Sequence, residues 1–240
     1  MRILAFDTTN STLSVAILED QKILAKSTIF ENGKQSEMLI PEIEKILTEA
    51  KIWYQDLDYL AATQGPGSFT GVRIGLSSAR TLKLATNLPL ILLDSLEVLA
   101  FKYRHKFGQN SGKIFAAIDA RMDEFFIGNF LSNAGEISKI SESQLVSFSD
   151  VINFLPKEKF FLCGSGKKIL AEILENKNFE FEYNEEEDVI EADLVGLLAK
   201  IKISGEILEN NSEALYLREP RISKRKEENN GGRGRNRTDA

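Results

Sequence analysis

The chain has 240 residues, of which 42% are hydrophobic and 28% are charged, and its formal net charge is −6 at pH 7. This length allows one large domain or two small ones, and the lack of any run of about 18 apolar residues in the sequence argues against a membrane span or a membrane partner. One cysteine and one histidine cannot build an intramolecular disulfide or a zinc site of three or four His and Cys ligands, which fits a cytoplasmic protein with no metal of its own.

The first half of the chain alternates apolar strands with amphipathic helices, as an α/β lobe does. Its first strand ends in Asp7, Thr8 and Thr9, and its first helix carries Leu39 and Ile43 on the apolar face. In chain order we predict strands at residues 2–9, 11–19 and 22–29, a helix at 36–50, a strand at 59–63, a helix at 71–85, a strand at 88–93 and a helix at 95–103.

The most informative stretch is the glycine-rich turn from Gly65 to Gly67, which joins a strand to a helix. Ser68 and Thr70 are candidates for the N-cap of that helix. A strand, a glycine turn and a helix N-terminus leave backbone N–H groups free to bind an anion. The simpler interpretation is that the glycines only make a tight turn.

Small residues share one face of the helix at 71–85, because Gly71, Gly75, Ser78 and Ala79 recur at spacings of three or four. Glycine in a helix costs about 1 kcal/mol relative to alanine, so close approach of another backbone is expected to offset that cost. This backbone belongs either to the chain's own sheet or to a helix of a partner.

The second half of the chain repeats the beginning of the first. A polar run near Phe107 marks a domain boundary, and the apolar strand after it ends in Asp119, as the first strand ends in Asp7. We therefore predict two related α/β lobes around a cleft, at residues 1–106 and 107–222. The second lobe is predicted to contain strands at 113–121, 124–132, 145–148 and 159–163, and helices at 150–155, 167–175 and 191–203.

The helix at 191–203 would place Leu194, Leu197, Leu198 and Ile201 inward, and it could pack back on the first lobe. Residues 223–240 are predicted to be a disordered basic tail. Before Lys224 the chain holds 24 basic and 33 acidic residues, a charge of about −9, so the body is a poor nucleic-acid binder by itself. The tail is either a contact for nucleic acid or a solvated appendage.

Few side chains offer chemistry. Asp7 and Asp119 would face each other across the cleft and could hold a magnesium–phosphate group, or each could cap a turn. Gly164-Ser165-Gly166 forms a second strand, glycine turn and helix unit, and the acidic run 185–188 is interpreted as a solvated loop. His105 is interpreted as a surface histidine of the linker, so no nucleophile–base pair and no catalytic residue are predicted.

Five motifs occur along the chain in a recognisable order. They are ILAFDTT at 3–9, LIPEI at 39–43, GPGSFTGVRIG at 65–75, AIDARMDE at 117–124 and YLR at 216–218. Together they resemble the TsaB (YeaZ) family of tRNA threonylcarbamoyladenosine biosynthesis proteins. The third and fourth motifs are far more specific than a lone glycine motif.

The resemblance implies an actin-like ATPase fold, that of the sugar kinase, Hsp70 and actin superfamily, with two related lobes. It also implies a non-catalytic paralogue of TsaD, which activates and stabilises TsaD while TsaD transfers the threonylcarbamoyl group to adenosine in tRNAs that read ANN codons. The ATPase TsaE would join the complex, and the free protein could pair with itself through the same surface. No cofactor is expected in the chain itself, and ATP or magnesium would belong to the complex.

Two departures from related sequences bear on chemistry. TsaD proteins carry a His-x-x-x-His metal pattern after the strand that follows the glycine-rich helix, and by alignment Ser95 and Leu99 stand in those places here. Family members often have a histidine before the motif at 39–43, where this chain has Lys34-Gln35-Ser36. For a non-catalytic subunit we interpret this second change as harmless.

The small-residue face and the resemblance together predict that a partner binds the helices at 36–50 and 71–85. The expected contact residues are Leu39, Ile43, Gly71, Arg73, Ile74, Gly75, Ser78, Ala79 and Leu82. Replacing Gly75 with Leu would then weaken the pairing without unfolding the chain.

The alternative function is an ATP-binding phosphotransferase or ATPase of the actin-like superfamily. Its vestigial nucleotide site would consist of Asp7, Thr8, Thr9, Asp119, Gly164 and Gly166. This hypothesis depends on superfamily analogy, which is a weak argument for function.

Overall fold

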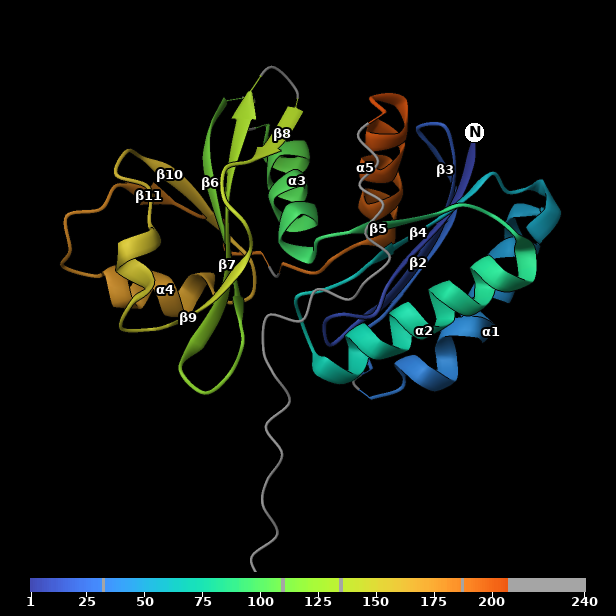
Figure 1. Ribbon diagram of the computed structural model, residues 1–240, viewed down its shortest axis with the longest axis horizontal. Coiled ribbons are helices and arrows are strands. Elements are labelled where there is room, and N and C mark those ends of the chain that lie inside the picture. The colour runs from blue at the N-terminus through green and yellow to red at the C-terminus, as the bar shows by residue number, and fades with distance from the viewer. Residues whose placement is uncertain (32, 109–110, 134–135, 187, 207–240) are drawn as a thin grey trace, which may run out of the picture.

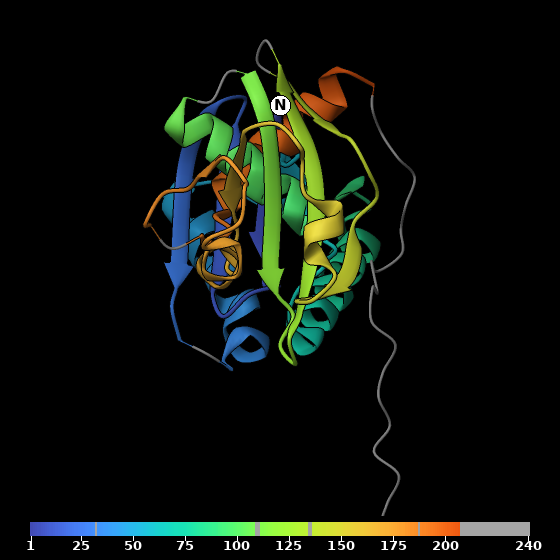
Figure 2. The same ribbon diagram turned by 90° about the vertical axis from the view of Figure 1, so that its left-hand side faces the viewer.

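The computed structural model describes residues 1–31, 33–108, 111–133, 136–186 and 188–206, and Figures 1 and 2 show it from two directions. Two mixed sheets stand opposite each other with helices α3 and α5 between them. The strands are β1 (Arg2–Asp7), β2 (Leu13–Glu19), β3 (Lys22–Ile29), β4 (Tyr59–Thr63), β5 (Leu90–Leu93), β6 (Ser111–Asp119), β7 (Glu124–Asn133), β8 (Glu136–Lys139), β9 (Gln144–Ser147), β10 (Phe160–Cys163) and β11 (Phe181–Glu182). The helices are α1 (Gln35–Ala50), α2 (Phe69–Thr86), α3 (Ser95–Phe107), α4 (Lys167–Leu174) and α5 (Ala192–Ser204), with 3₁₀ turns at Tyr54–Asp56 and Val151–Phe154.

The first sheet has the strand order β3-β2-β1-β4-β5. Its central strand β1 pairs antiparallel with β2 and parallel with β4. β1 is buried from Ile3 to Asp7. A strand that is covered on both faces in this way needs apolar residues along nearly its whole length, which explains the apolar run in the sequence. Helices α1 and α2 cover one face of this sheet, where Leu39 and Ile43 enter the apolar core (Figure 1).

The second sheet repeats this topology. Its order, taken from the β8 edge, is β8-β7-β6-β10-β11, so β6 occupies the place of β1. β6 likewise pairs antiparallel with β7 and parallel with β10. Both central strands end in an aspartate, Asp7 and Asp119. The prediction of two related α/β lobes is therefore confirmed.

Two helices are exchanged between the sheets. α3 follows β5 in the chain, yet it packs on β6, β7 and β8, whereas α5 comes from the second half and packs on β1 and β2. Gly196 lets α5 approach closely, since a Cβ there would lie 2.3 Å from Leu18 Cδ1 and 3.3 Å from Ala5 Cβ. Side chains from both helices and both sheets form one continuous apolar core.

Three local predictions were wrong. α3 continues to Phe107, so His105 lies in the last turn of a helix, stacked on Phe101 with ring centroids 5.6 Å apart, and not in a linker. Ile201 is 44% exposed, while Val195 takes an inward position on α5. The helix predicted at 150–155 is a single 3₁₀ turn.

The motif at 216–218, the end of the second lobe at 222 and the predicted tail at 223–240 lie outside the described residues. Within the described ranges, no helix has both the length and the apolar composition needed to cross a bilayer.

Candidate functional site

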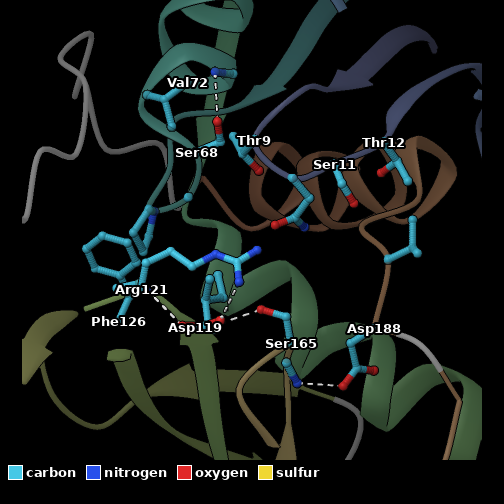
Figure 3. Close-up of a pocket in the computed structure, with 18 of the residues that line it drawn as sticks. Thr9, Ser11, Thr12, Ser68, Val72, Asp119, Arg121, Phe126, Ser165 and Asp188 are labelled. Carbon is cyan, nitrogen blue, oxygen red and sulfur yellow. Dashed lines mark hydrogen bonds and ion pairs between the residues drawn. The ribbon is translucent and has the colours of Figure 1, made fainter. Parts of the chain in front are cut away.

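A cleft of about 1200 Å³ opens between the lobes, beside the ends of β1 and β6 (Figure 3). The residues on its facing walls include Thr9, Ser11 and Thr12 from the first lobe, and Asp119, Ser165 and Asp188 from the second. β1 lies between an antiparallel and a parallel neighbour, and crevices at the carboxyl ends of such strands are the usual ligand sites of α/β proteins. The cleft is therefore the expected position of a ligand site.

Asp7 ends β1 but does not line the cleft. The side chain is fully buried, and its Oδ1 accepts hydrogen bonds from Thr63 Oγ1 at 2.5 Å and Thr9 Oγ1 at 2.6 Å. Burial raises the pKa of the Asp7 carboxyl to about 6, against the opposing effect of these hydrogen bonds. The expectation that Asp7 and Asp119 face each other across the cleft was wrong, because Asp7 is enclosed by its own turn and only Asp119 reaches the wall.

Ser95 and Leu99, which the resemblance aligns with a His-x-x-x-His metal pattern, lie inside the fold. Ser95 Oγ is 3.2 Å from Thr9 Oγ1, and Thr9 in turn donates to Asp7. Leu99 is buried in the core that joins the two sheets. Over the part of the chain that the structure describes, no group of three or more His, Cys, Asp and Glu side chains is placed to hold a metal ion.

The glycine turn before α2 packs on the β1–β2 turn. Ser68 N donates to Thr9 O at 2.7 Å, and a Cβ at Gly67 would lie 2.4 Å from the same oxygen. Ser68 is the N-cap of α2, and its Oγ accepts a hydrogen bond from Gly71 N at 3.3 Å. The backbone N–H groups of Ser68 and Gly71, which an anion would need as donors, are therefore already hydrogen-bonded within the chain. This favours the interpretation of the glycines as a tight turn.

The second glycine turn is closed by an acidic side chain. Asp188 Oδ2 accepts hydrogen bonds from Gly164 N at 2.6 Å and Lys167 Nζ at 2.9 Å. Both partners of this ion pair are 4% exposed, so the interpretation of Asp188 as part of a solvated loop was wrong. The sequence did not predict this ion pair, because its two members are 21 residues apart and no periodic pattern relates them.

Asp119 caps the turn between β6 and β7. Its Oδ1 accepts from Arg121 N at 2.8 Å, and its Oδ2 lies 3.3 Å from Arg121 Nη1. Arg121, Met122 and Asp123 all have left-handed φ angles, of 62°, 57° and 58°, which non-glycine residues adopt only under local constraint. Of the six residues predicted for a nucleotide site, Thr9, Asp119 and Gly164 line the cleft, whereas Asp7, Thr8 and Gly166 do not.

The small-residue face of α2 lies against the chain's own β1–β2 turn. A Cβ at Gly71 would stand 2.0 Å from Thr8 O, and one at Gly75 would stand 2.5 Å from Thr8 Oγ1. Close approach of Thr8 therefore explains both glycines, through its backbone oxygen at Gly71 and its hydroxyl at Gly75, so the neighbour of these glycines lies within the chain. The expectation that Gly75→Leu would leave the fold intact was wrong, since the larger side chain has no space there.

Six of the nine predicted contact residues are buried within the protein: Leu39, Ile43, Gly71, Gly75, Ala79 and Leu82. Arg73 is exposed, and Ile74 and Ser78 are half-buried. α1 and α2 also show exposed apolar side chains that the sequence analysis did not select, namely Ile40, Phe69 and Leu84, of which Phe69 also lines the cleft. The sequence could have indicated these residues, because each is an apolar residue that lies outside the buried stripe of its helix.

Comparisons with known proteins find two related families. The family model of tRNA N6-adenosine threonylcarbamoyltransferase, TsaD, matches residues 32–220. The tRNA threonylcarbamoyladenosine biosynthesis protein TsaB of Bacillus subtilis is 32% identical over 186 residues, which cover 75% of this chain and 79% of that protein.

Solved structures show the fold. YeaZ from Pseudomonas aeruginosa matches with a TM-score of 0.77 at 24% identity, over 90% of this chain and 99% of that one. The Lmo2764 protein of Listeria monocytogenes matches with a TM-score of 0.52 at 12% identity, over 85% and 100% of the two chains. The fold is the actin-like ATPase fold with two mixed α/β sheets.

Proposed function

The chain belongs to the TsaB family of tRNA threonylcarbamoyladenosine biosynthesis proteins, and from this premise we propose that it is the non-catalytic partner of TsaD in that modification. The observation that carries the proposal is that the polar groups in and beside the cleft are enclosed or bonded within the chain. Asp7 is enclosed, Leu99 fills an aligned metal-ligand position, and Asp188 occupies the second glycine turn. Groups that a nucleotide-dependent enzyme would direct at its substrate are bonded here to the chain itself.

The surface proposed to bind TsaD is the outer face of α1 and α2, which lie side by side (Figure 1). Ile40 on α1 and Leu84 on α2 are 42% and 87% exposed. Arg73 reaches the Phe69 ring, with its guanidinium carbon 3.4 Å from the ring centroid, and together they form a patch of polar and apolar groups near the start of α2. Exposed apolar side chains within a polar surround are typical of protein interfaces.

The match of the TsaD family model to this chain supports a pairing of similar partners. Two proteins with the same fold can present the same two helices to each other about an approximate two-fold axis. The free protein would use this surface to form a homodimer, which TsaD replaces. TsaE and tRNA then join through the complex, because the acidic body is a weak binder of nucleic acid by itself.

Reconstitution tests the proposal. TsaD and TsaE of the same organism are supplied with threonylcarbamoyl-adenylate and unmodified tRNA, with and without this chain, and threonylcarbamoyladenosine is quantified by mass spectrometry of nucleosides. We expect modification to depend on the chain and to survive Asp119→Asn, which changes the cleft but not the α1–α2 face. Full modification without the chain, or abolition by Asp119→Asn with the TsaD complex intact, would contradict the proposal.

A further inference from the structure

α3 and α5 are the helices through which the two sheets meet. α3 packs on β6, β7 and β8, α5 packs on β1 and β2, and the two helices contact each other between the sheets (Figure 1). Their buried side chains, such as Leu99 and Leu198, belong to one apolar cluster. Apolar contact is not directional, so by itself it would allow one helix to slide over the other.

An ion pair joins the first turn of α3 to the last turn of α5. Lys202 Nζ lies 2.8 Å from Glu97 Oε1, and the two side chains are only 23% and 11% exposed. Asp94, the N-cap of α3, accepts hydrogen bonds from Lys139 Nζ at 3.1 Å and from Ser143 Oγ at 2.5 Å. The start of α3 is thereby bonded both to α5 and to the second sheet.

A second group of ion pairs joins the end of α3 to the start of α5. Glu191 directly precedes α5, and its Oε1 binds Lys106 and lies 3.5 Å from Lys102 Nζ, both on α3. Its Oε2 lies 3.6 Å from Lys26 Nζ on β3, and Lys26 also donates to Asp193 Oδ2 at 3.2 Å. Glu191 therefore bonds at once to a strand of the first sheet and to the helix that covers the second.

The burial of these charged groups points to a role in geometry. Lys102 is 4% exposed, and removing ions from water is costly unless their partners are placed correctly. A buried ion pair therefore adds little stability compared with apolar side chains of similar size, but it tolerates few arrangements of its partners. Because α3 and α5 are paired at both ends, a slide or rotation between them would separate charges at one end or the other.

We propose that the pair Glu97–Lys202 and the cluster of Glu191 with Lys26, Lys102 and Lys106 form an interlobe clamp. The clamp holds α3 in one register on α5 and so keeps the cleft at one width. In shear motions, packed elements slide by about 1–2 Å and the units that they carry move with them. Here such a slide would move the second sheet relative to the first, and the clamp opposes it. This inference is independent of the pairing with TsaD, which uses α1 and α2.

Pulsed electron paramagnetic resonance between two spin labels tests the proposal. In the full chain with Cys163→Ala, the labels are attached to Thr81→Cys on α2 and Glu172→Cys on α4, two exposed positions on helices at opposite sides of the cleft (Figure 1). With the clamp intact we expect one narrow distance distribution. For Glu97→Gln combined with Glu191→Gln we expect its mean or its width to change by about 2 Å or more, because a slide of about 1–2 Å between the helices is enlarged across the cleft.

The two Gln substitutions leave lysines without their carboxylates and could unfold the chain. Glu97→Leu combined with Lys202→Met is the second variant for the same measurement, because it removes both ions of one pair and keeps apolar side chains in their place. We expect its Tm to stay near that of the wild type while the distance distribution still shifts or broadens. A stable protein with an altered interlobe distance separates a role in register from a role in stability.

Glu158→Gln is the matched control, since it breaks an ion pair with Lys113 that lies within the second lobe. It should leave the distance distribution unchanged. An unchanged distribution in both clamp variants, or an equal change in the control, would overturn the proposal. So would failure of both clamp variants to fold, because the ion pairs would then be required for the fold itself and not for its register.

Discussion

Thr8 and Gly75 are in such close contact that a single added methyl group cannot be placed between them. A Cβ at Gly75 would stand 2.5 Å from Thr8 Oγ1, the hydroxyl that donates a hydrogen bond to Gly71 O at 2.8 Å. At Gly71 the obstacle is instead the backbone, because a Cβ there would stand 2.0 Å from Thr8 O. α2 is thereby held against the β1–β2 turn at two successive points.

The two glycines should respond differently to a change at Thr8. We expect Gly75→Ala and Gly71→Ala each to lower the free energy of unfolding by about 1–3 kcal/mol, since overpacking outweighs the helix propensity of alanine. Thr8→Ala should relieve the cost at Gly75, where a hydroxyl is in the way, but not at Gly71. Urea unfolding of the single and double variants measures both couplings, and equal coupling at the two sites would contradict the geometry.

Asp7 should make the protein less stable as pH rises. Its folded-state pKa is about 6, against an ordinary value of 3.8, so between these values the native state holds a proton that the unfolded state has released. The free energy of unfolding therefore falls across this window, by about 3 kcal/mol for a shift of this size. Asp7→Asn removes the titration, so wild type should lose about that much relative to the variant between pH 3.5 and pH 7.

Urea unfolding at several pH values makes this comparison, with Asp150→Asn as a control for the loss of one surface carboxylate. Parallel pH profiles for the wild type and Asp7→Asn would show that Asp7 titrates alike in both states.

Glu191 should have the opposite pH dependence. Although burial opposes it, the neighbouring Lys106, Lys102 and Lys26 lower the pKa of its carboxyl. Its stabilising contribution is thus present above the ordinary value of 4.5 and is lost as pH falls through the folded-state value. At pH 7 we expect Glu191→Gln to cost about 1–3 kcal/mol, because Lys102, which is 4% exposed, would lose its carboxylate.

The same unfolding measurement below pH 4 should show a smaller difference between the wild type and Glu191→Gln. Glu158→Gln, which breaks the exposed pair with Lys113, is the matched control and should have no measurable effect. A control that is as costly as Glu191→Gln would mean that burial at Lys102 is unimportant.

The partner surface is tested by a charge on the outer face of α1 or α2. Leu84→Arg and Ile40→Arg are each expected to weaken co-purification with TsaD by at least about tenfold, since a desolvated charge at an interface is costly, while Tm stays near that of the wild type. Ile140→Arg, on the second lobe with an exposure of 51%, is the control and should bind normally. Normal binding by both α1 and α2 variants would place the contact elsewhere.

Much of the fold could be predicted because strands and helices here follow their periodicities. β1 and β6 are apolar runs that end in aspartate, and this likeness correctly indicated two related lobes. The packing of α3 on the second sheet left no comparable signal, since periodicity identifies the apolar face of a helix but not the sheet that it covers. Ile201 shows the limit, for it falls on the expected stripe and is exposed.

The candidate site was less predictable, because its chemistry depends on contacts between distant residues. Asp7 and Asp119 end equivalent strands, yet one is enclosed by Thr9 and Thr63 and the other lines the cleft. The glycines of α2 were recognised as costly, but the neighbour that explains them, Thr8, is 63 residues away from Gly71. Spacing along the chain cannot choose between such partners.

The exchange of helices has a consequence for synthesis on the ribosome. The face of the first sheet that carries Ala5, Ala16 and Leu18 receives its cover only when α5 has been made. At 5–20 residues per second, the interval between Leu93 and Ser204 lasts roughly 5 to 20 s. Throughout that interval a nascent chain with all five strands of its first sheet still exposes an apolar surface, so it is a natural client for ribosome-associated chaperones.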